Sequence, residues 1–360
     1  MTESVLLRVD GREWGGWTEF SFTSSLDAIA GEFDLTVTTQ WSSAAPRTIK
    51  EGMPCVLTLG NDTVLTGYID DFIPSYDAEN ISIRVTGRDR TGDLVDSSVV
   101  HKSGQWKGLT LFQIAVEVCS PFGIEVVNET VHGAPFGSVV LEQGESAFEL
   151  LDRLAKQRGV LLTSDGNGRL VITRASKQRA TVALKLGSNI LAARGRFSWK
   201  ERNSAYIVKG QASAGGKLWD AQPPAQIGGI QTVIADPEIT RYRPKIIVKE
   251  DSLTVEGAGT RGEWFRARSL GDARMTEITV AGWREQGDAG PLWRKNRLVD
   301  IDDVVQNLRV TWLIKSVTLT EGDNGRIAVL MLVPPESMDM TARHEKTVKT
   351  SKSMGKKTWD

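Results

Sequence analysis

The residues that could carry out chemistry are few and widely separated in this sequence. His101, His132 and His344 are its three histidines, and none lie at the short spacing that places two ligands on one metal ion. Cys55 and Cys119 are its two cysteines, which excludes a disulfide framework and a thiolate zinc cluster. Cys119 falls at an apolar helix position and Cys55 has no histidine nearby, so we expect neither to act as a nucleophile.

Two acidic clusters could suggest carboxylate metal sites. In the strand-like segment VDIDDV, Asp300 and Asp302 would face one side and Asp303 the other, and no glycine-centred binding loop follows. We therefore expect an acidic strand end at the surface. The same argument applies to Asp70 and Asp71, because neighbouring residues of a strand point to opposite faces.

Glu142, Glu145 and Glu149 form the best local cluster for the two carboxylates that a glycosidase needs. Glu149 instead completes a capping box with Ser146, in which each side chain bonds the other residue's backbone N–H. Glu145 lies just before this helix start, where the helix dipole favours negative charge. The sequence thus predicts no catalytic residue, no cofactor-binding residue and no metal ligand.

Glycine-rich and basic stretches also favour structural interpretations. GDNG at 322–325 and DGNG at 165–168 each lie between two strand-like runs, which is typical of hairpin turns rather than phosphate loops. A basic region with Trp264 and Phe265 could bind a polyanion, but a solvated face or a subunit contact is favoured. Its cations are Arg241, Arg243, Lys245, Lys249, Arg261, Arg266, Arg268 and Arg274.

The overall composition supports this choice. The chain has 360 residues, with 44 Lys and Arg against 45 Asp and Glu, and therefore lacks the basic excess of a dedicated nucleic-acid binder. The length suggests two to four domains. No apolar run approaches the roughly 20 residues of a membrane span, and the N-terminus lacks a signal-peptide pattern. We expect a soluble, non-secreted chain that does not contact a membrane.

Hydrophobic periodicity divides the chain into five parts. Alternating strands bounded by turn residues predict a first small β-barrel over residues 1–98. Two helices and intervening strands predict an α/β domain over 99–175. Strands at 176–210 and 300–335 predict a second β-barrel, interrupted by an inserted α/β domain at 211–299. Residues 336–360 read as a flexible basic tail.

Specific segments carry this division. The predicted helices are 109–119, 147–158 after the Ser146 capping box, and 262–275. A Gly/Pro/Ala/Gln stretch at 210–230 reads as a mobile loop. Residues 66–87 and 312–333 share one pattern: a short aliphatic strand, an acidic turn and an alternating strand. This weak internal repeat suggests two similar barrels within a mainly β, α+β fold.

The order of these segments resembles the baseplate hub proteins of Mu-like tailed phages. The similar segments include VLLRVDGREWGGWTEFSFTSS, GYIDDF with ISIRVTGRDRTGDLVDSS, GESAFELLDRLAKQRGVLLTSDGNGRLVITRA and WLIKSVTLTEGDNGRIAVLMLVPPE. The resemblance spans nearly the whole chain, with residues from about 211 to 300 and the basic tail matching least clearly.

The resemblance implies a non-enzymatic structural protein without cofactors, similar to the trimeric hubs of contractile tails. Such a homotrimeric ring would join the six-fold tail tube, or a tube-end adaptor, to the three-fold central spike, and a tape measure protein is a further possible partner. DNA would pass through the lumen only in transit. The protein would be made and assembled in the host cytoplasm and act in the virion tail baseplate.

The residues also allow two other interpretations. A tail-associated enzyme that degrades cell-wall glycan would use residues 100–175 as its lytic module, and would require an acid–nucleophile pair in a cleft. The hub of a contractile injection or secretion machine would be chemically the same molecule in another setting.

Overall fold

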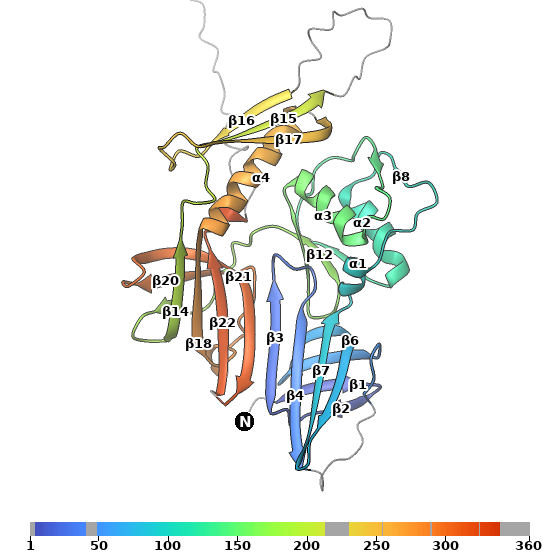
Figure 1. Cartoon of the computed structure of the whole chain (residues 1–360), viewed down its shortest axis with the longest axis vertical. Helices are drawn as coiled ribbons and strands as arrows, with labels where there is room; N and C mark the ends of the chain where they lie inside the picture. Colours follow the sequence, from blue (N-terminus) through green and yellow to red (C-terminus); the bar gives the residue numbers. More distant parts are fainter. Residues whose placement is uncertain are drawn as a thin grey trace, which may run out of the picture.

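The structure is a computed structural model of the chain (Figure 1). It describes residues 4–40, 49–212, 230–253, 255–288, 290–323 and 325–338. His344, residues 213–229 of the predicted loop and residues 339–360 of the predicted tail lie outside the described residues.

A 13-stranded sheet dominates the molecule. Its path runs β14-β18-β22-β21-β3-β4-β7-β6-β5-β1-β2, and β20 joins β21 and β13 beside this path (Figure 1). Its strands are β1 (Val5–Val9), β2 (Arg12–Trp14), β3 (Glu19–Ser25), β4 (Glu32–Gln40), β5 (Pro54–Leu59), β6 (Asp62–Tyr76), β7 (Asn80–Asp89), β13 (Leu184–Lys185), β14 (Ile190–Phe197), β18 (Arg274–Ala281), β20 (Leu298–Asp303), β21 (Leu308–Gly322) and β22 (Gly325–Val333).

The sheet corrects one expectation: the two predicted small barrels are not closed. β21 of the second half pairs with β3 of the first half, from Ser316 opposite Ser25 to Glu321 opposite Phe20. The two predicted barrels are therefore joined edge to edge into one sheet, whose recorded path ends at β14 and β2. A barrel needs its last strand to pair with its first, and β14 and β2 do not pair with each other.

Strict alternation places the main core on one face of this sheet. In β4, Phe33, Leu35 and Val37 are buried, whereas Asp34 and Thr36 between them are more accessible. One hydrophobic cluster extends across both halves of the sheet, from Leu7 to Leu332. Because apolar burial contributes roughly 25 cal/mol per Å², this continuous core holds the two halves together.

A smaller α/β unit follows the first seven strands. Thr110 caps α2, and Ser146 and Glu149 form the predicted capping box at the start of α3. The helix at 147–158 ends at Gly159 in the left-handed conformation, as predicted. The elements are α1 (Gly92–Asp96), β8 (Gln105–Trp106), α2 (Leu111–Cys119), η2 (Ser120–Phe122), β9 (Val126–Asn128), β10 (Val139–Val140), α3 (Ala147–Arg158), β11 (Leu161–Ser164) and β12 (Leu170–Thr173).

An outer unit combines a mixed three-stranded sheet, in the order β16-β15-β17, with one helix (Figure 1). Its elements are β15 (Ala205–Ala212), β16 (Ile230–Ala235), β17 (Pro244–Leu253) and α4 (Val255–Ala273). After α4, β18 returns to the large sheet between β14 and β22. The short elements β19 (Glu285–Asp288) and η4 (Pro335–Ser337) complete the fold.

Helix α4 differs from the predicted helix over 262–275. It begins at Val255, in a segment whose glycines disfavour a helix from local propensity alone. Gly262 lets this helix pack closely on β16, because a Cβ there would lie 2.5 Å from Cγ1 of Ile234. It ends at Ala273 because Arg274 and Met275 pair with β14 in the large sheet. Arg274 is thus a strand residue rather than a helix residue.

Candidate functional site

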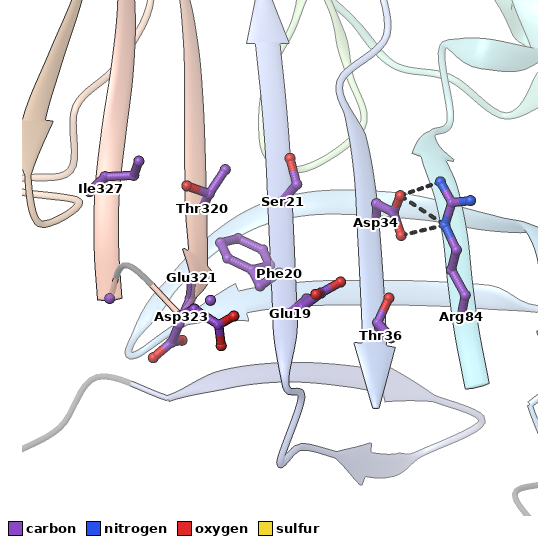
Figure 2. A pocket seen from close by; sticks show the side chains of 12 residues that line it. Glu19, Phe20, Ser21, Asp34, Thr36, Arg84, Thr320, Glu321, Asp323 and Ile327 are labelled. Carbon is purple, nitrogen blue, oxygen red and sulfur yellow. Dashed lines mark hydrogen bonds and ion pairs between the residues drawn. The ribbon is translucent and has the colours of Figure 1, made fainter. Parts of the chain in front are cut away.

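Near the junction of its two halves, the accessible face of the large sheet carries hydroxyl and charged side chains. Figure 2 shows Thr320 of β21, Ser21 of β3 and Asp34 of β4 side by side on this face, with Arg84 of β7 beside them. They line a shallow depression of about 510 Å³ across the junction of the two halves. We call this surface, opposite the core, the polar face.

Two arginines of β7 on the polar face form ion pairs. Arg84 forms a bidentate ion pair with Asp34, with Nε donating at 2.9 Å and 3.0 Å (Figure 2). Arg88 binds Asp70 at 2.7 Å and Asp96 at 2.6 Å. These hydrogen bonds raise the pKa of both guanidinium groups and lower the pKa of Asp96. A passing polyanion would therefore meet few unpaired cations on this part of the face.

The structure also corrects the expected orientation of Asp70 and Asp71. A β-bulge between Ile69 and Asp71 interrupts the alternation of β6. Asp70 therefore binds Arg88, and Asp71 accepts a hydrogen bond at 3.1 Å from Thr86, two residues away on the same face of β7. The two carboxylates consequently lie on one face rather than on opposite faces.

The junction between β21 and β3 is an antiparallel ladder with neutral side chains on the polar face. The hydroxyl groups of Thr23 and Thr318 form a hydrogen bond at 3.1 Å across it. Ser21 lies opposite Thr320, and Ser25 opposite Ser316. This ladder joins strands that are almost 300 residues apart in the chain.

The two halves of the large sheet repeat one strand order. The sequence β3-β4-β7-β6-β5 in the first half matches β14-β18-β22-β21-β20 in the second. The bulge between Ile69 and Asp71 in β6 recurs between Ile314 and Ser316 in β21. Across β6, β7, β4 and β3, the register places Phe72, Val85, Leu35 and Phe20 opposite one another in turn. Across β21, β22, β18 and β14, it places Val317, Leu330, Ile278 and Ala193 opposite one another in the same way. β6 thus corresponds to β21, and β3 to β14.

In this correspondence, β6 and β14 each lack the strand partner that β21 and β3 have in each other. The second part of β21 pairs with β3, but the equivalent part of β6, from Asp71 to Ser75, pairs only with β7 among the described strands. β3 pairs with β21, but β14 pairs only with β18 among the described strands. β14 is correspondingly exposed, with Leu191 61% and Phe197 50% accessible.

The backbone of β14 offers hydrogen-bonding groups on its outer side. Ser198 N donates to Ala273 O at 2.8 Å. Because hydrogen-bonded pairs alternate along an antiparallel ladder, the backbone N–H and C=O groups of Arg196 and Arg194 also point toward β18. The backbone N–H and C=O groups of Ala193 and Gly195 point away from the sheet. In the edge strands of native proteins, such groups are a template for pairing with another chain.

The candidate cysteines and histidines do not form a site among the described residues. Cys55 and Cys119 are buried in different core clusters, and burial raises the pKa of each thiol to about 12. His101 stacks on Trp106 with ring centroids 4.4 Å apart, and His132 lies near Phe112. Within the described ranges, no group of three or more histidine, cysteine or acidic residues could hold a metal ion.

The acidic residues near the end of β20 lie at the surface or bind the backbone. Asp300 and Asp302 are exposed, as expected, but Asp303 is 1% accessible. The expectation of a surface position is wrong for Asp303 because its carboxylate accepts hydrogen bonds from the backbone of Val305 and Gln306, which closes the following turn.

The glutamates at the start of α3 are engaged in the same way. Glu145 forms a bidentate pair with Arg153, at 2.8 Å and 2.9 Å. Glu142 lies 3.8 Å from the same guanidinium, and Glu149 completes the capping box with Ser146.

The predicted basic and aromatic cluster lies partly between α3 and α4. Arg261 stacks over Trp264 and Phe265 at about 5 Å, and Lys156 of α3 approaches Trp264 at 5.1 Å. Burial lowers the pKa of Arg261, and Arg266 is 8% accessible and bound to Glu263. These cations are therefore engaged in contacts within the chain.

Sequence reasoning missed a cleft of about 730 Å³ where the large sheet meets the α/β unit. Lys295 lines it and donates to Ser25 O at 3.1 Å. Asp89, which also lines it, accepts hydrogen bonds from Gly31, Thr91 and Ser164. Burial lowers the pKa of Lys295 and raises that of Asp89. No local signal marks this cleft, because its lining comes from distant segments.

Lys295 makes a testable contribution to the pH dependence of stability. Its folded pKa of about 8 lies below the usual 10.5, so folding releases a proton between these values and the free energy of unfolding should rise with pH there. In urea unfolding, we expect the free energy of unfolding of the unmodified chain to rise from pH 8 to pH 10 relative to that of Lys295→Met, which lacks this titrating group. A constant difference over this range would contradict the assignment.

Three family models match the chain. They are a baseplate hub protein gp44-like second domain over residues 91–174, a Mu phage baseplate assembly protein GpP-like N-terminal domain over residues 4–89, and a GpP fourth domain over residues 254–341.

Full-length relatives agree with these matches. The baseplate hub protein gp44 of Escherichia phage Mu is 36% identical over 343 residues, covering 93% of this chain and 88% of the relative. The crystal structure of the 43 kDa tail protein of prophage MuSo2 from Shewanella oneidensis is 48% identical, with a TM-score of 0.86, covering 94% of this chain and all of that one.

More distant structures share the fold alone. One is the E. coli c3393 protein, a type VI secretion system component, with 15% identity and a TM-score of 0.58 over 91% of this chain and 76% of that one. No helix in the described residues is long and apolar enough to span a membrane. The named relatives are baseplate and tail proteins rather than enzymes. The chain therefore belongs to the family of Mu-like baseplate hub proteins and is a structural component of the phage tail baseplate.

Proposed function

We propose that three copies of this chain form a closed ring that joins the tail tube to the central spike. Each copy would contribute both halves of its large sheet. The edge of β14 in one copy would pair with the free part of β6 in the next copy, and the ring would close after three such junctions.

The observation that carries this proposal is the pair of unmatched edges. The contact that β14 and β6 lack is the one that β3 and β21 make inside the chain. The same strand order and the same bulge are present on both sides. Two copies could thus repeat the internal ladder, and a heterologous contact of this kind closes into a ring when its rotation permits.

A ring with this composition would suit an adaptor. Three copies with two similar halves each present six similar units to a six-fold tube, yet retain the three-fold symmetry of a spike. The proposed partners are the tube protein or a tube-end adaptor, the spike protein and a tape measure protein. Because a baseplate must not dissociate, we expect each subunit interface to bury upward of roughly 2,000 Å².

The polar face would line the channel through which DNA passes in transit. Its short hydroxyl side chains and its paired Asp34 and Arg84 provide little net positive charge. Phosphate contacts with unpaired cations dominate non-specific DNA affinity, so this surface would let DNA slide without being held.

The division of the chain remains part of the proposal. Residues 1–98 would form one ring unit. Residues 176–204 with 274–335 would form the other, because β15 lies in the outer sheet and β18, within the predicted insertion at 211–299, lies in the large sheet. Residues 99–175 and 205–273 would form the α/β and inserted domains outside the ring. The basic tail would begin after Met338, because Ser337 and Met338 of the predicted tail at 336–360 are buried.

The direct test is the mass of the purified full-length chain by light scattering, with negative-stain images of the same peak. We expect the mass of three copies and a ring with a central hole. A compact monomer that persists at high protein concentration would overturn the proposal.

A further inference from the structure

We propose that an ion pair between Arg196 of one copy and Asp71 of the next determines which strand edges meet in the ring. This inference rests on the proposed function, because it concerns the junction between copies. It identifies what makes that junction different from the neutral junction inside the chain.

The register of the junction follows from the internal repeat. Phe20 corresponds to Ala193, so Thr23 corresponds to Arg196, three residues further along each strand. Ser316 corresponds to Asp71, the first residue after the shared bulge, and Thr318 therefore corresponds to Ile73. Inside the chain, Thr23 lies opposite Thr318. Arg196 would accordingly lie opposite Ile73 of the neighbouring copy, two residues from its Asp71.

The two side chains would share the polar face and lie within reach of each other. Diagonal neighbours across an antiparallel pair are about 7–8 Å apart, which a long arginine side chain can span. Arg196 falls on the same face as Thr23 does in β3, and Asp71 on the face that carries Thr86. Both residues are exposed in the single chain.

Both charges also lack an ion-pair partner among the described residues. Within β6, Asp70 is already held by Arg88, whereas Asp71 accepts a hydrogen bond from the Thr86 hydroxyl. Within β14, Arg194 lies opposite Glu277, whereas Arg196 lies opposite Met275. Arg194 forms no ion pair among the described residues either, but it corresponds to Ser21 and would lie opposite Ser75 of the next copy, four residues from Asp71. Arg196 is therefore the cation of β14 that the register brings closest to Asp71.

The same pair would discriminate against incorrect assembly. The polar-face residues of β3 are Glu19, Ser21, Thr23 and Ser25, none of which carries a positive charge. If β3 of another copy paired with β6, Asp71 would lack a cation, and Glu19 would add negative charge. Specificity arises from such a difference between correct and incorrect partners. The ion pair therefore favours β14 as the partner of β6.

The test reverses each charge in the full-length chain and measures the ring by light scattering over a dilution series. We expect Arg196→Asp and Asp71→Arg each to raise the concentration at which half of the rings dissociate by about tenfold or more, because like charges then face each other. The double variant, with both charges reversed in one chain, should recover most of this loss. Arg12→Asp, the same change on the exposed edge strand β2, should leave the ring unchanged.

Mixing the two single variants gives a second readout. Junctions between unlike variants regain opposite charges, whereas junctions between like variants do not. A ring with an even number of copies can alternate the variants and recover fully. A ring of three must retain one junction between like variants, so we expect only partial recovery.

The possible results separate this inference from the proposed function. If the unmodified chain forms a three-copy ring that Arg196→Asp leaves unchanged, the ion pair is overturned and the hub ring stands. If both single variants dissociate and the double variant does not recover, the residues matter but do not pair, which also overturns the inference. If the unmodified chain is monomeric, the ring itself is wrong.

Discussion

Replacing Ala193 with proline should separate the ring into folded monomers. The backbone N–H of Ala193 points away from β18, so its loss leaves the ladder within the chain intact. Across the proposed junction it would be a ladder donor, as Phe20 is opposite Glu321. Proline removes this donor and adds a ring that obstructs the neighbouring strand. Leaving the partner carbonyl unpaired costs about 1–3 kcal/mol. This corresponds to association weaker by roughly five- to 150-fold, measurable by light scattering at serial dilutions.

Two controls make this result interpretable. Ala193→Ser retains the N–H and should assemble like the unmodified chain. Circular dichroism and the urea unfolding midpoint should be similar for the proline and serine variants, which would show that the monomer still folds. A proline variant that remains a ring at the same concentrations would exclude β14 as the subunit edge.

Replacing Asp236 with alanine should have the largest effect on the stability of a single chain. Arg202 and Asp236 are 1% and 3% accessible and form a bidentate ion pair, with Nη2 at 2.7 Å from Oδ2. Arg202 also binds Glu238, which binds Arg274 of β18, so this network ties the outer unit to the large sheet. Removing Asp236 leaves a buried charge without its closest partner. We expect the free energy of unfolding to fall by about 3–5 kcal/mol in urea titrations.

The matched control replaces both partners with apolar residues of similar size. Arg202→Met combined with Asp236→Leu leaves no buried charge at this position, and should be clearly more stable than Asp236→Ala. If Asp236→Ala alone lies within about 1 kcal/mol of the unmodified chain, water replaces the lost carboxylate and the network does not secure the outer unit.

Local features of the fold could be predicted from the sequence because short segments encode them. The predicted hairpins at residues 165–168 and 322–325 both connect paired strands. The capping box of Ser146 and Glu149 begins α3 as predicted. Each of these signals depends on residues within a few positions of one another, where backbone preference and side-chain hydrogen bonds decide the structure.

Interactions between distant residues could not be predicted in this way. The bulge before Asp71 reverses the expected orientation of a carboxylate without a local sequence signal. The first turns of α4 contain glycines of low helix propensity, so the local pattern does not predict a helix there. The cleft around Lys295 is assembled from segments that lie far apart in the chain. In each case a partner from elsewhere in the fold overrides the local pattern.

By itself, the sequence determined the strands, turns and capped helices, the weak repeat between residues 66–87 and 312–333, and the family to which the chain belongs. Only the tertiary structure decided that two predicted barrels are instead one open sheet. That decision depends on the pairing of β21 with β3, whose hydrogen bonds are made by backbone groups that every residue carries. Because those groups leave no mark on the sequence, the choice of strand partner, and with it the unmatched edges of β6 and β14, emerges only when the whole chain packs around one core.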